Sequence, residues 1–153
     1  MSRLEIGYQA PEFSLMDHNN KKHQLSDYQG QWLILFFYPK DNTPGCTIEA
    51  CQFSHDFAEI SALNSSILGI NTDNIESHQR FINKQQLSFP LLSDPTANLC
   101  KSYGALIKLG PIKFCKRHSF IINPEGNIAK IYRKVIPAQH SQQIITDLKV
   151  LQS

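Results

Sequence analysis

Residues 33–51 read LILFFYPKDNTPGCTIEAC and place a short apolar run directly ahead of a helix start signal. The run at residues 33–38 is continuous, which is typical of a strand buried on both faces of a sheet. Thr43 is a favourable N-cap, and Pro44 suits the first helical position because its missing N–H would be unpaired there in any case. The segment therefore predicts a buried strand followed at once by a helix over residues 44–63.

A second strand is expected at residues 67–71, directly after this helix. A strand, a helix and another strand in this order imply a parallel pair joined by a right-handed crossover. The remaining expected elements are helices at residues 75–86, 95–103 (with Asp94 as N-cap) and about 144–151, and hairpins formed by residues 13–15 with 23–25 and by 118–122 with 128–133. This order predicts an α/β fold with a mixed central sheet, helices on both faces and a small N-terminal β-hairpin extension.

A cysteine follows directly after the helix start signal. Cys46 falls in the first turn of the expected helix. Unpaired N–H groups and the positive end of the helix dipole stabilise a thiolate over a thiol at such a position. Cys51 follows five positions later and is placed to react with whatever product Cys46 forms. These two cysteines indicate a redox active site.

Three other interpretations of these cysteines are weaker. A buried structural cysteine would be flanked by apolar periodicity, whereas Cys46 follows Thr, Pro and Gly. Structural zinc sites favour pairs two to four residues apart with a second pair downstream, and Cys100 and Cys115 form no such pair. A permanent disulfide is disfavoured because residues five apart in an ideal helix lie about 8–9 Å apart, beyond the roughly 7 Å limit for a bridge.

Length and composition limit the class of protein. The 153 residues suit a single domain over residues 1–153, and 41% hydrophobic with 18% charged residues is typical of a globular chain. A net charge of +2, with no basic patch beyond residues 113–117, argues against nucleic acid as the main partner. The longest apolar run, residues 32–38, is too short to span a membrane, and the first residues lack the apolar stretch of a signal peptide. A cytoplasmic location is therefore expected, where disulfides tend to be catalytic or transient.

Matches to one known family extend along nearly the whole chain. The matching segments are GYQAPEF at residues 7–13, FYPK at 37–40, TPGCT at 43–47, EAC at 49–51, SH at 77–78, FPLLSD at 89–94, YG at 103–104, and Arg117 ahead of FII at 120–122. Pro39, Thr43 and Cys46 stand at the Pro-x-x-x-Thr-x-x-Cys spacing that is highly specific to that superfamily. On these segments the sequence resembles the peroxiredoxins, specifically the bacterioferritin-comigratory or peroxiredoxin Q group.

The resemblance implies a thioredoxin-like fold and a thiol-dependent peroxidase. It implies that Cys46 is the peroxidatic cysteine, which attacks a hydroperoxide and becomes a sulfenic acid, and that Pro39, Thr43 and Arg117 complete its pocket. Cys51 is then the resolving cysteine, which condenses with the sulfenic acid to an intramolecular disulfide. Thioredoxin or a similar dithiol is the expected reductant, and no metal, haem or flavin is needed. A monomer, or at most a weak dimer, is expected.

The residue types fit that chemistry. Arg117 is always charged and offers several fixed donors, which suit it to a thiolate and to a breaking O–O bond. The Thr43 hydroxyl can donate a hydrogen bond to the thiolate or accept one from the peroxide proton, and Pro39 would shield the thiolate from water. Glu49 matches the family motif, and two interpretations stay open for it: an anchor for the arginine, or a solvated carboxylate on the helix face.

Other residues are given structural interpretations or left open. Cys100 follows Leu99 in the short expected helix and is interpreted as a buried hydrophobic residue. Cys115 lies two residues before Arg117, so an accessory redox role stays open for it. His78 is interpreted as structural, because the six histidines are scattered with no metal-binding spacing.

Two other functions remain to be separated from peroxide reduction. A thiol–disulfide oxidoreductase would share the fold, but that activity normally uses Cys-x-x-Cys, which is absent here. A non-enzymatic thiol sensor or holdase would oxidise and then bind client proteins. The spacing of Cys46 and Cys51 adds one expectation to the peroxidase hypothesis: the first turns of the helix must unwind before the disulfide forms.

Overall fold

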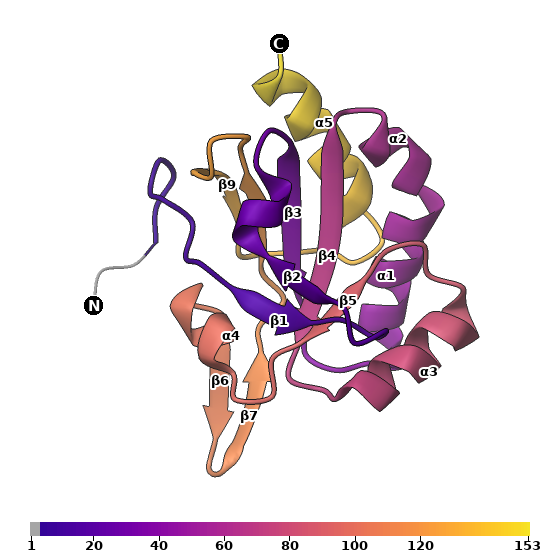
Figure 1. Cartoon of the computed structure of the whole chain (residues 1–153). Helices are drawn as coiled ribbons and strands as arrows, with labels where there is room; N and C mark the ends of the chain where they lie inside the picture. The colour runs from indigo at the N-terminus through magenta and orange to yellow at the C-terminus, as the bar shows by residue number, and fades with distance from the viewer. Residues whose placement is uncertain (1–3) are drawn as a thin grey trace.

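A mixed five-stranded sheet forms the centre of the computed structural model, which describes residues 4–153 (Figure 1). Its strand order is β5-β4-β3-β8-β9. The three parallel strands are β3 (Trp32–Phe37), β4 (Ser65–Asn71) and β5 (Leu91–Ser93). β8 (Ser119–Ile122) runs antiparallel to β3 and pairs antiparallel with β9 (Ile128–Tyr132). The predicted mixed sheet, including its parallel crossover and the late hairpin, is confirmed.

Helices cover both faces of this sheet. One face is buried under α1 (Pro44–His55), α2 (Phe57–Ser61), α3 (Ile75–Gln85) and α5 (His140–Leu151). The other face is buried under α4 (Asn98–Ser102), the short 3-10 helix η1 (Leu25–Tyr28) and the N-terminal segment. The fold is therefore thioredoxin-like in its layers, as expected.

The apolar run that opened the sequence argument supplies both layers at once. Its odd members pack into one buried cluster and its even members into the other, the two sets being Leu33, Leu35 and Phe37, and Ile34, Phe36 and Tyr38. Alternation with a period of two is what a strand with two buried faces requires. On the neighbouring strand β4, side chains from β3 and β5 leave no room for a side chain at Gly69. A Cβ there would lie 2.7 Å from Leu91 Cδ2 and 2.8 Å from Phe36 Cζ.

The helix expected over residues 44–63 is in fact two helices, and that prediction is wrong in its continuity. α1 ends at His55, and Asp56 separates it from α2 with φ −93° and ψ 8°. The Asp56 carboxylate accepts a hydrogen bond of 2.8 Å from the Ser141 hydroxyl of α5. Aspartate favours helix boundaries because its short side chain offers local alternatives to helical hydrogen bonding.

The helix expected over residues 95–103 is also shorter than expected, and Asp94 is not its N-cap. A turn closed by the Ala97 N–H and the Asp94 carbonyl comes first, and Ala97 is the N-cap with a left-handed φ of 62°. The Asp94 carboxylate still accepts the Cys100 N–H at 2.9 Å, so it ties down the first turn from a distance. Asp94 therefore binds a free N–H group of the first turn of α4, as an N-cap side chain would, although it lies before the preceding turn.

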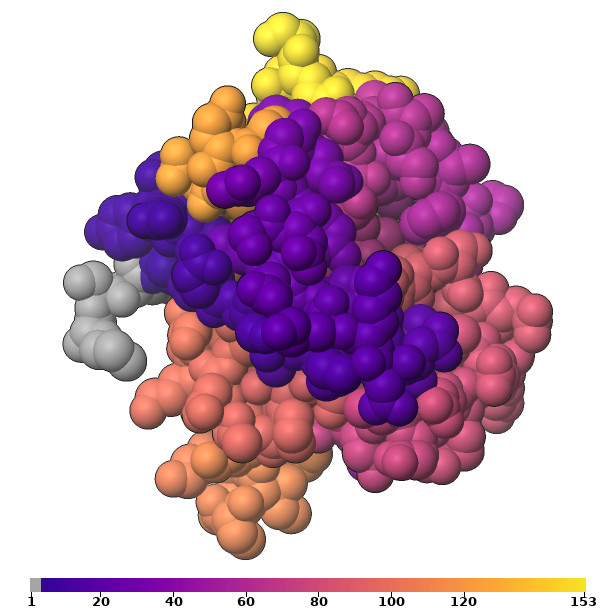
Figure 2. All heavy atoms as spheres, in the orientation of Figure 1, coloured from indigo at the N-terminus to yellow at the C-terminus, as the bar shows by residue number. Residues whose placement is uncertain are grey.

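Two hairpins flank the central sheet. The N-terminal one, β1 (Ser14–Met16) with β2 (Lys22–Gln24), is confirmed to within one residue. The second, β6 (Leu106–Leu109) with β7 (Ile112–Cys115), was not expected, and it projects at the bottom of the molecule in Figures 1 and 2. It carries the chain from α4 back to residue 117. Within residues 4–153, no helix combines the length and the apolar character needed to cross a bilayer.

Candidate active site

Cys46 lies in the first turn of α1, directly behind the loop that leaves β3. The helix begins at Pro44 with Thr43 as its N-cap residue, as the sequence predicted. The cysteine is only 1% exposed, because it packs in the same buried cluster as Tyr38 and Phe53. The sulfur therefore has little contact with solvent and lies in the first turn of a twelve-residue helix.

Arg117 is distant from this cysteine in sequence but close to it in space. It follows β7 and lies 71 positions after Cys46, yet its Nη2 is 3.4 Å from Cys46 Sγ. Its side chain is 22% exposed, so most of the guanidinium is shielded from solvent. Burial lowers the pKa of Arg117, but the charges of Cys46 and Glu49 outweigh it and raise that pKa overall. The guanidinium therefore stays charged beside the sulfur.

Glu49 holds the other side of the guanidinium. Its Oε1 accepts a hydrogen bond of 2.8 Å from Arg117 Nη1, and its side chain is fully buried. Of the two interpretations left open by the sequence, the arginine anchor is confirmed and the solvated carboxylate is wrong. Burial raises the pKa of Glu49 to about 7, although the Arg117 charge acts in the opposite direction. Its Oε2 has no hydrogen-bond partner among the described residues, which is consistent with a costly buried charge.

Gly45 provides the space that lets the arginine reach the cysteine. A Cβ on this residue would lie 3.0 Å from Arg117 Nη2 and 3.9 Å from Pro137 Cγ. A contact of 3.0 Å is too tight for an ordinary side chain, so the guanidinium would have to move by a few tenths of an ångström. The glycine between Pro44 and Cys46 is thus part of the geometry of the site, which the motif alone did not indicate.

Thr43 and Pro39 both lie on the loop between β3 and α1. The Thr43 hydroxyl donates to the Lys40 carbonyl at 2.8 Å and makes no capping hydrogen bond to the helix. Its proton is therefore engaged, and of the two roles expected for the hydroxyl, donor to the thiolate and acceptor of a hydrogen bond from the peroxide, the acceptor role fits this geometry. Pro39 directly follows Tyr38 at the end of the buried run and is half-buried.

Cys51 lies on the second turn of α1, half-buried, and is a free thiol like Cys46. Its Sγ lies 3.5 Å from Gln85 Oε1 at the end of α3, as donor to that oxygen. Burial raises the pKa of the Cys51 thiol. Since α1 is continuous from Pro44 to His55, both cysteines are held on an intact helix, as the sequence led us to expect for the reduced protein.

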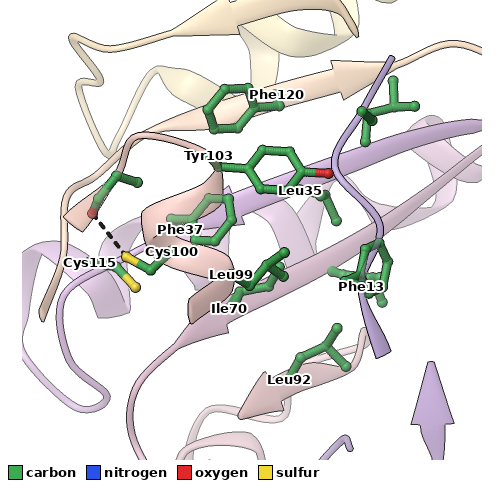
Figure 3. Packing of buried hydrophobic residues seen from close by; sticks show 14 of the residues in the cluster. Phe13, Leu35, Phe37, Ile70, Leu92, Leu99, Cys100, Tyr103, Cys115 and Phe120 are labelled. Atoms are coloured by element: carbon green, nitrogen blue, oxygen red, sulfur yellow. Dashed lines mark hydrogen bonds between the residues drawn. The ribbon is translucent and has the colours of Figure 1, made fainter. Parts of the chain in front are cut away.

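The other two cysteines pack together in the opposite layer. Cys100 and Cys115 are both fully buried, and Figure 3 shows their sulfur atoms side by side next to Phe37. Cys100 Sγ donates to the Ala105 carbonyl at 2.9 Å. The hydrogen bond with Cys100, together with burial, raises the pKa of the Cys115 thiol well above its ordinary value. The interpretation of Cys100 as a buried hydrophobic residue is confirmed, and the accessory redox role considered for Cys115 stays a prediction.

One residue close to the site was not singled out from the sequence. Asp41 lies on the same loop as Thr43, and its buried carboxylate accepts a hydrogen bond of 2.7 Å from His78 of α3. An Asp-Asn pair between a strand and a helix is an ordinary turn signal, so no local pattern distinguishes Asp41 from a solvated turn residue. Among residues 4–153, no group of three or more His, Cys, Asp or Glu side chains is arranged to hold a metal ion.

Comparison with known proteins is consistent with this geometry. The family model described as the AhpC/TSA family matches residues 6–131. Peroxiredoxin Bcp of Bacillus subtilis is 36% identical over 150 residues, which cover 95% of this chain and 96% of the relative. Peroxiredoxin Bcp of Escherichia coli strain K12 is 35% identical over 156 residues, which cover 97% of this chain and 98% of the relative.

Solved structures superpose on all or nearly all of the chain. The crystal structure of a PrxQ mutant from Xylella fastidiosa superposes with a TM-score of 0.93 at 33% identity, and covers 100% of both chains. A bacterioferritin comigratory protein from Xanthomonas campestris, whose structures were described as insights into alkyl peroxide reduction activity, gives a TM-score of 0.87 at 31% identity and 92% coverage of each chain.

Proposed function

The chain belongs to the AhpC/TSA family and is a thiol-dependent peroxidase of the Bcp peroxiredoxin group, and from that premise we propose that Cys46 is the residue that reacts with the hydroperoxide. Its thiolate attacks the distal peroxide oxygen, the O–O bond breaks, and the second oxygen leaves with a proton as water or an alcohol. Cys46 is oxidised to a sulfenic acid, and the peroxide is reduced by two electrons. The hydroperoxides meant are hydrogen peroxide and organic hydroperoxides, the latter in line with the alkyl peroxide activity named for the Xanthomonas relative.

The observation that supports this proposal best is the 3.4 Å distance between Arg117 Nη2 and Cys46 Sγ. A fixed cation at that distance favours the thiolate and can also stabilise the negative charge that develops on the peroxide oxygens. Glu49 is the positioning residue for this cation, because it holds the other end of the guanidinium. Thr43 and Pro39 line the approach: the threonine oxygen accepts a hydrogen bond from the peroxide, and the proline keeps a backbone donor away from the thiolate.

Cys51 completes the proposed cycle as the resolving residue. Its thiol condenses with the Cys46 sulfenic acid, a water leaves, and an intramolecular disulfide forms. An external dithiol then attacks this disulfide, accepts the oxidation and restores both thiols. We take thioredoxin as that dithiol, a monomer as the working form and the cytoplasm as the compartment, since a reducing compartment supplies the electrons that this cycle consumes.

A coupled assay tests the proposal. Wild-type protein with NADPH, thioredoxin reductase and thioredoxin should consume hydroperoxide, and Cys46→Ser should not, because a serine hydroxyl is hardly ionised at neutral pH. Cys100→Ser is the matched control, since it removes a cysteine from the opposite layer. Substantial turnover by Cys46→Ser would rule out its role. A wild type that oxidises without turnover would favour a thiol sensor, and disulfide exchange without peroxide consumption would favour an oxidoreductase.

A further inference from the structure

A buried polar cluster lies beneath the loop that carries Thr43. Its centre is the carboxylate of Asp41, whose side chain is 1% exposed. This carboxylate accepts four hydrogen bonds: at Oδ1 from Tyr38 Oη (2.6 Å) and Asn71 Nδ2 (3.1 Å), and at Oδ2 from Ser77 Oγ (2.8 Å) and His78 Nδ1 (2.7 Å). A buried carboxylate with four donors is an anion that its surroundings are built to hold.

The hydrogen-bond partners of His78 determine its protonation state. Its side chain is fully buried, with Nδ1 2.7 Å from Asp41 Oδ2 and Nε2 3.0 Å from the Leu92 carbonyl oxygen. An ionised carboxylate and a carbonyl oxygen can only accept, so with Asp41 ionised both ring nitrogens carry a proton. His78 is therefore an imidazolium in a buried ion pair. Burial raises the pKa of Asp41, but hydrogen bonds and the charge of His78 lower it overall, which agrees with an ionised partner.

This ion pair fixes the shape of the loop. The Asp41 N–H donates to Asp73 Oδ2 at 2.8 Å, so both the side chain and the backbone of Asp41 are tied to the segment that follows β4. The next residue, Asn42, adopts a left-handed φ of 60°, a conformation that asparagine tolerates better than most residues. Thr43 follows directly, so the direction in which the loop enters α1 depends on these contacts.

The pair also borders the cysteine pocket. Tyr38 donates to Asp41, and its ring belongs to the same buried cluster as Cys46. Burial raises the pKa of Tyr38 well above its ordinary value, and the charges of Asp41, Asp73 and Cys46 add to that effect. One hydroxyl is therefore within electrostatic reach of both Asp41 and the cysteine.

Charges around His78 come from each element that packs against it. Asp41 faces it from the β3–α1 loop, Asp73 follows β4 and binds Asn71 at 3.3 Å, and His18 approaches from the turn of the N-terminal hairpin. Lys40 lies 3.9 Å from Asp73 but is mostly exposed. Among residues 4–153, the imidazolium of His78 thus supplies the buried positive charge in contact with the Asp41 carboxylate. Without it, a buried negative charge would stand near the position where a thiolate must form.

We propose that Asp41 and His78 are a positioning pair for the reaction of Cys46: Asp41 holds the loop, and the His78 charge neutralises Asp41 so that the thiolate forms without a second uncompensated anion nearby. This inference rests on the proposed role of Cys46. It assigns no contact with the peroxide to either residue. His78, interpreted from the sequence as structural, thus acts on the site through a charge that it balances.

Charge balance makes a prediction that hydrogen bonding alone does not. His78→Gln keeps a donor but removes the positive charge, so the pH at which Cys46 becomes rapidly alkylated should rise by roughly half a unit or more, and peroxide oxidation at pH 7 should slow by about three- to tenfold. Asp41→Asn/His78→Gln removes both charges and should return the alkylation profile towards that of the wild type. Ser77→Ala is the matched control: it removes one hydrogen bond from Asp41, changes no charge and should leave the profile in place.

Alkylation of the Cys46 peptide by iodoacetamide across pH, followed by mass spectrometry, gives the profiles, and stopped-flow oxidation gives the rates. Equal profiles for wild type and His78→Gln, or equal shifts in the single and double variants, would overturn the proposal. If His78→Gln does not fold, ¹⁵N NMR of the wild type decides: two protonated ring nitrogens on His78 at pH 7 are expected, and one bare nitrogen would overturn it. Failure of the proposed role of Cys46 is separate, because it would appear as substantial peroxide turnover by Cys46→Ser in the coupled assay.

Discussion

At the scale of single residues, the site joins a local motif to a cation from a distant part of the chain. Thr43, Gly45 and Cys46 stand within four positions, and the helix start places them together. Arg117 and Glu49 are 68 positions apart, and their ion pair exists only because β8 returns next to β3. The burial of Glu49 could not be read from its neighbours, since a glutamate on a helix is usually solvated.

Replacement of Arg117 should affect the chemistry more than the fold. Arg117→Ala should slow the reaction with peroxide by roughly 10- to 1,000-fold, because it removes a preorganised charged donor 3.4 Å from the sulfur. The rate of Arg117→Lys should fall between those of the wild type and Arg117→Ala. Lysine keeps the positive charge but lacks the forked guanidinium that reaches both Cys46 and Glu49. Stopped-flow oxidation of each variant measures this. An unchanged rate in Arg117→Ala would contradict a role for the guanidinium in the reaction.

Glu49 should make stability depend on pH in a defined direction. Its pKa is raised from a usual value of 4.5 to about 7, so the folded protein binds its proton more tightly than the unfolded chain does. This contribution to stability is fully present below about pH 4.5 and is lost as pH rises through about 7, a loss on the order of 3 kcal/mol.

Urea unfolding of wild type and Glu49→Gln at pH 5 and pH 8 measures the effect. The wild type should lose stability relative to Glu49→Gln between the two pH values, because the glutamine does not titrate. A difference between the two proteins that is the same at both pH values would show that the Arg117 charge fully offsets the burial of Glu49.

At the scale of elements, the end of α1 is tied by hydrogen bonds to α5 and to the segment after α3. Ser54 donates to Ser88 at 3.0 Å after α3, and Asp56 accepts from Ser141 of α5 at 2.8 Å. The first turn depends on Cys46 and its contact with Arg117. A disulfide between residues five apart needs the helix to open, and these anchors indicate that it opens from Pro44 towards Cys51.

Opening should therefore accompany oxidation. Amide exchange over residues 44–50 should increase in the disulfide form, while residues 52–55 keep more of their protection. In Cys51→Ser the Cys46 sulfenic acid should persist and react with dimedone, which would give one turnover but no thioredoxin-linked cycling. Equal protection in both redox states, together with normal cycling by Cys51→Ser, would exclude the mechanism.

At the scale of the whole molecule, the sheet separates two buried layers that contain different cysteines. The layer under α1, α3 and α5 contains Cys46, and the layer under α4 contains Cys100 and Cys115. The interpretation of residues 1–153 as one domain stays a prediction. The separation explains why four cysteines in one small chain need not share one chemistry.

Cys100→Ser should accordingly leave catalysis intact. The serine hydroxyl can keep the hydrogen bond to Ala105, but burying a more polar group should cost about 1–2 kcal/mol of stability. Urea unfolding and the coupled peroxide assay measure the two effects. Peptide mapping after one equivalent of peroxide is the decisive check, since a disulfide between Cys100 and Cys46 would contradict the resolving role of Cys51.

The sequence by itself determined the order of most strands and helices, the buried strand at residues 33–38 and the start of α1 at Pro44, because these depend on local periodicity and capping. It did not determine the helix break at Asp56, where the hydrogen bond from Ser141 of α5 outweighs local helix propensity. It also did not determine the β6–β7 hairpin, which connects α4 to residue 117. Only the tertiary structure decided that Glu49 is buried on Arg117 and that Asp41 meets His78. An ion pair between distant residues produces no periodic pattern in the sequence, because tertiary packing decides both whether a charged side chain is buried and which residue it pairs with.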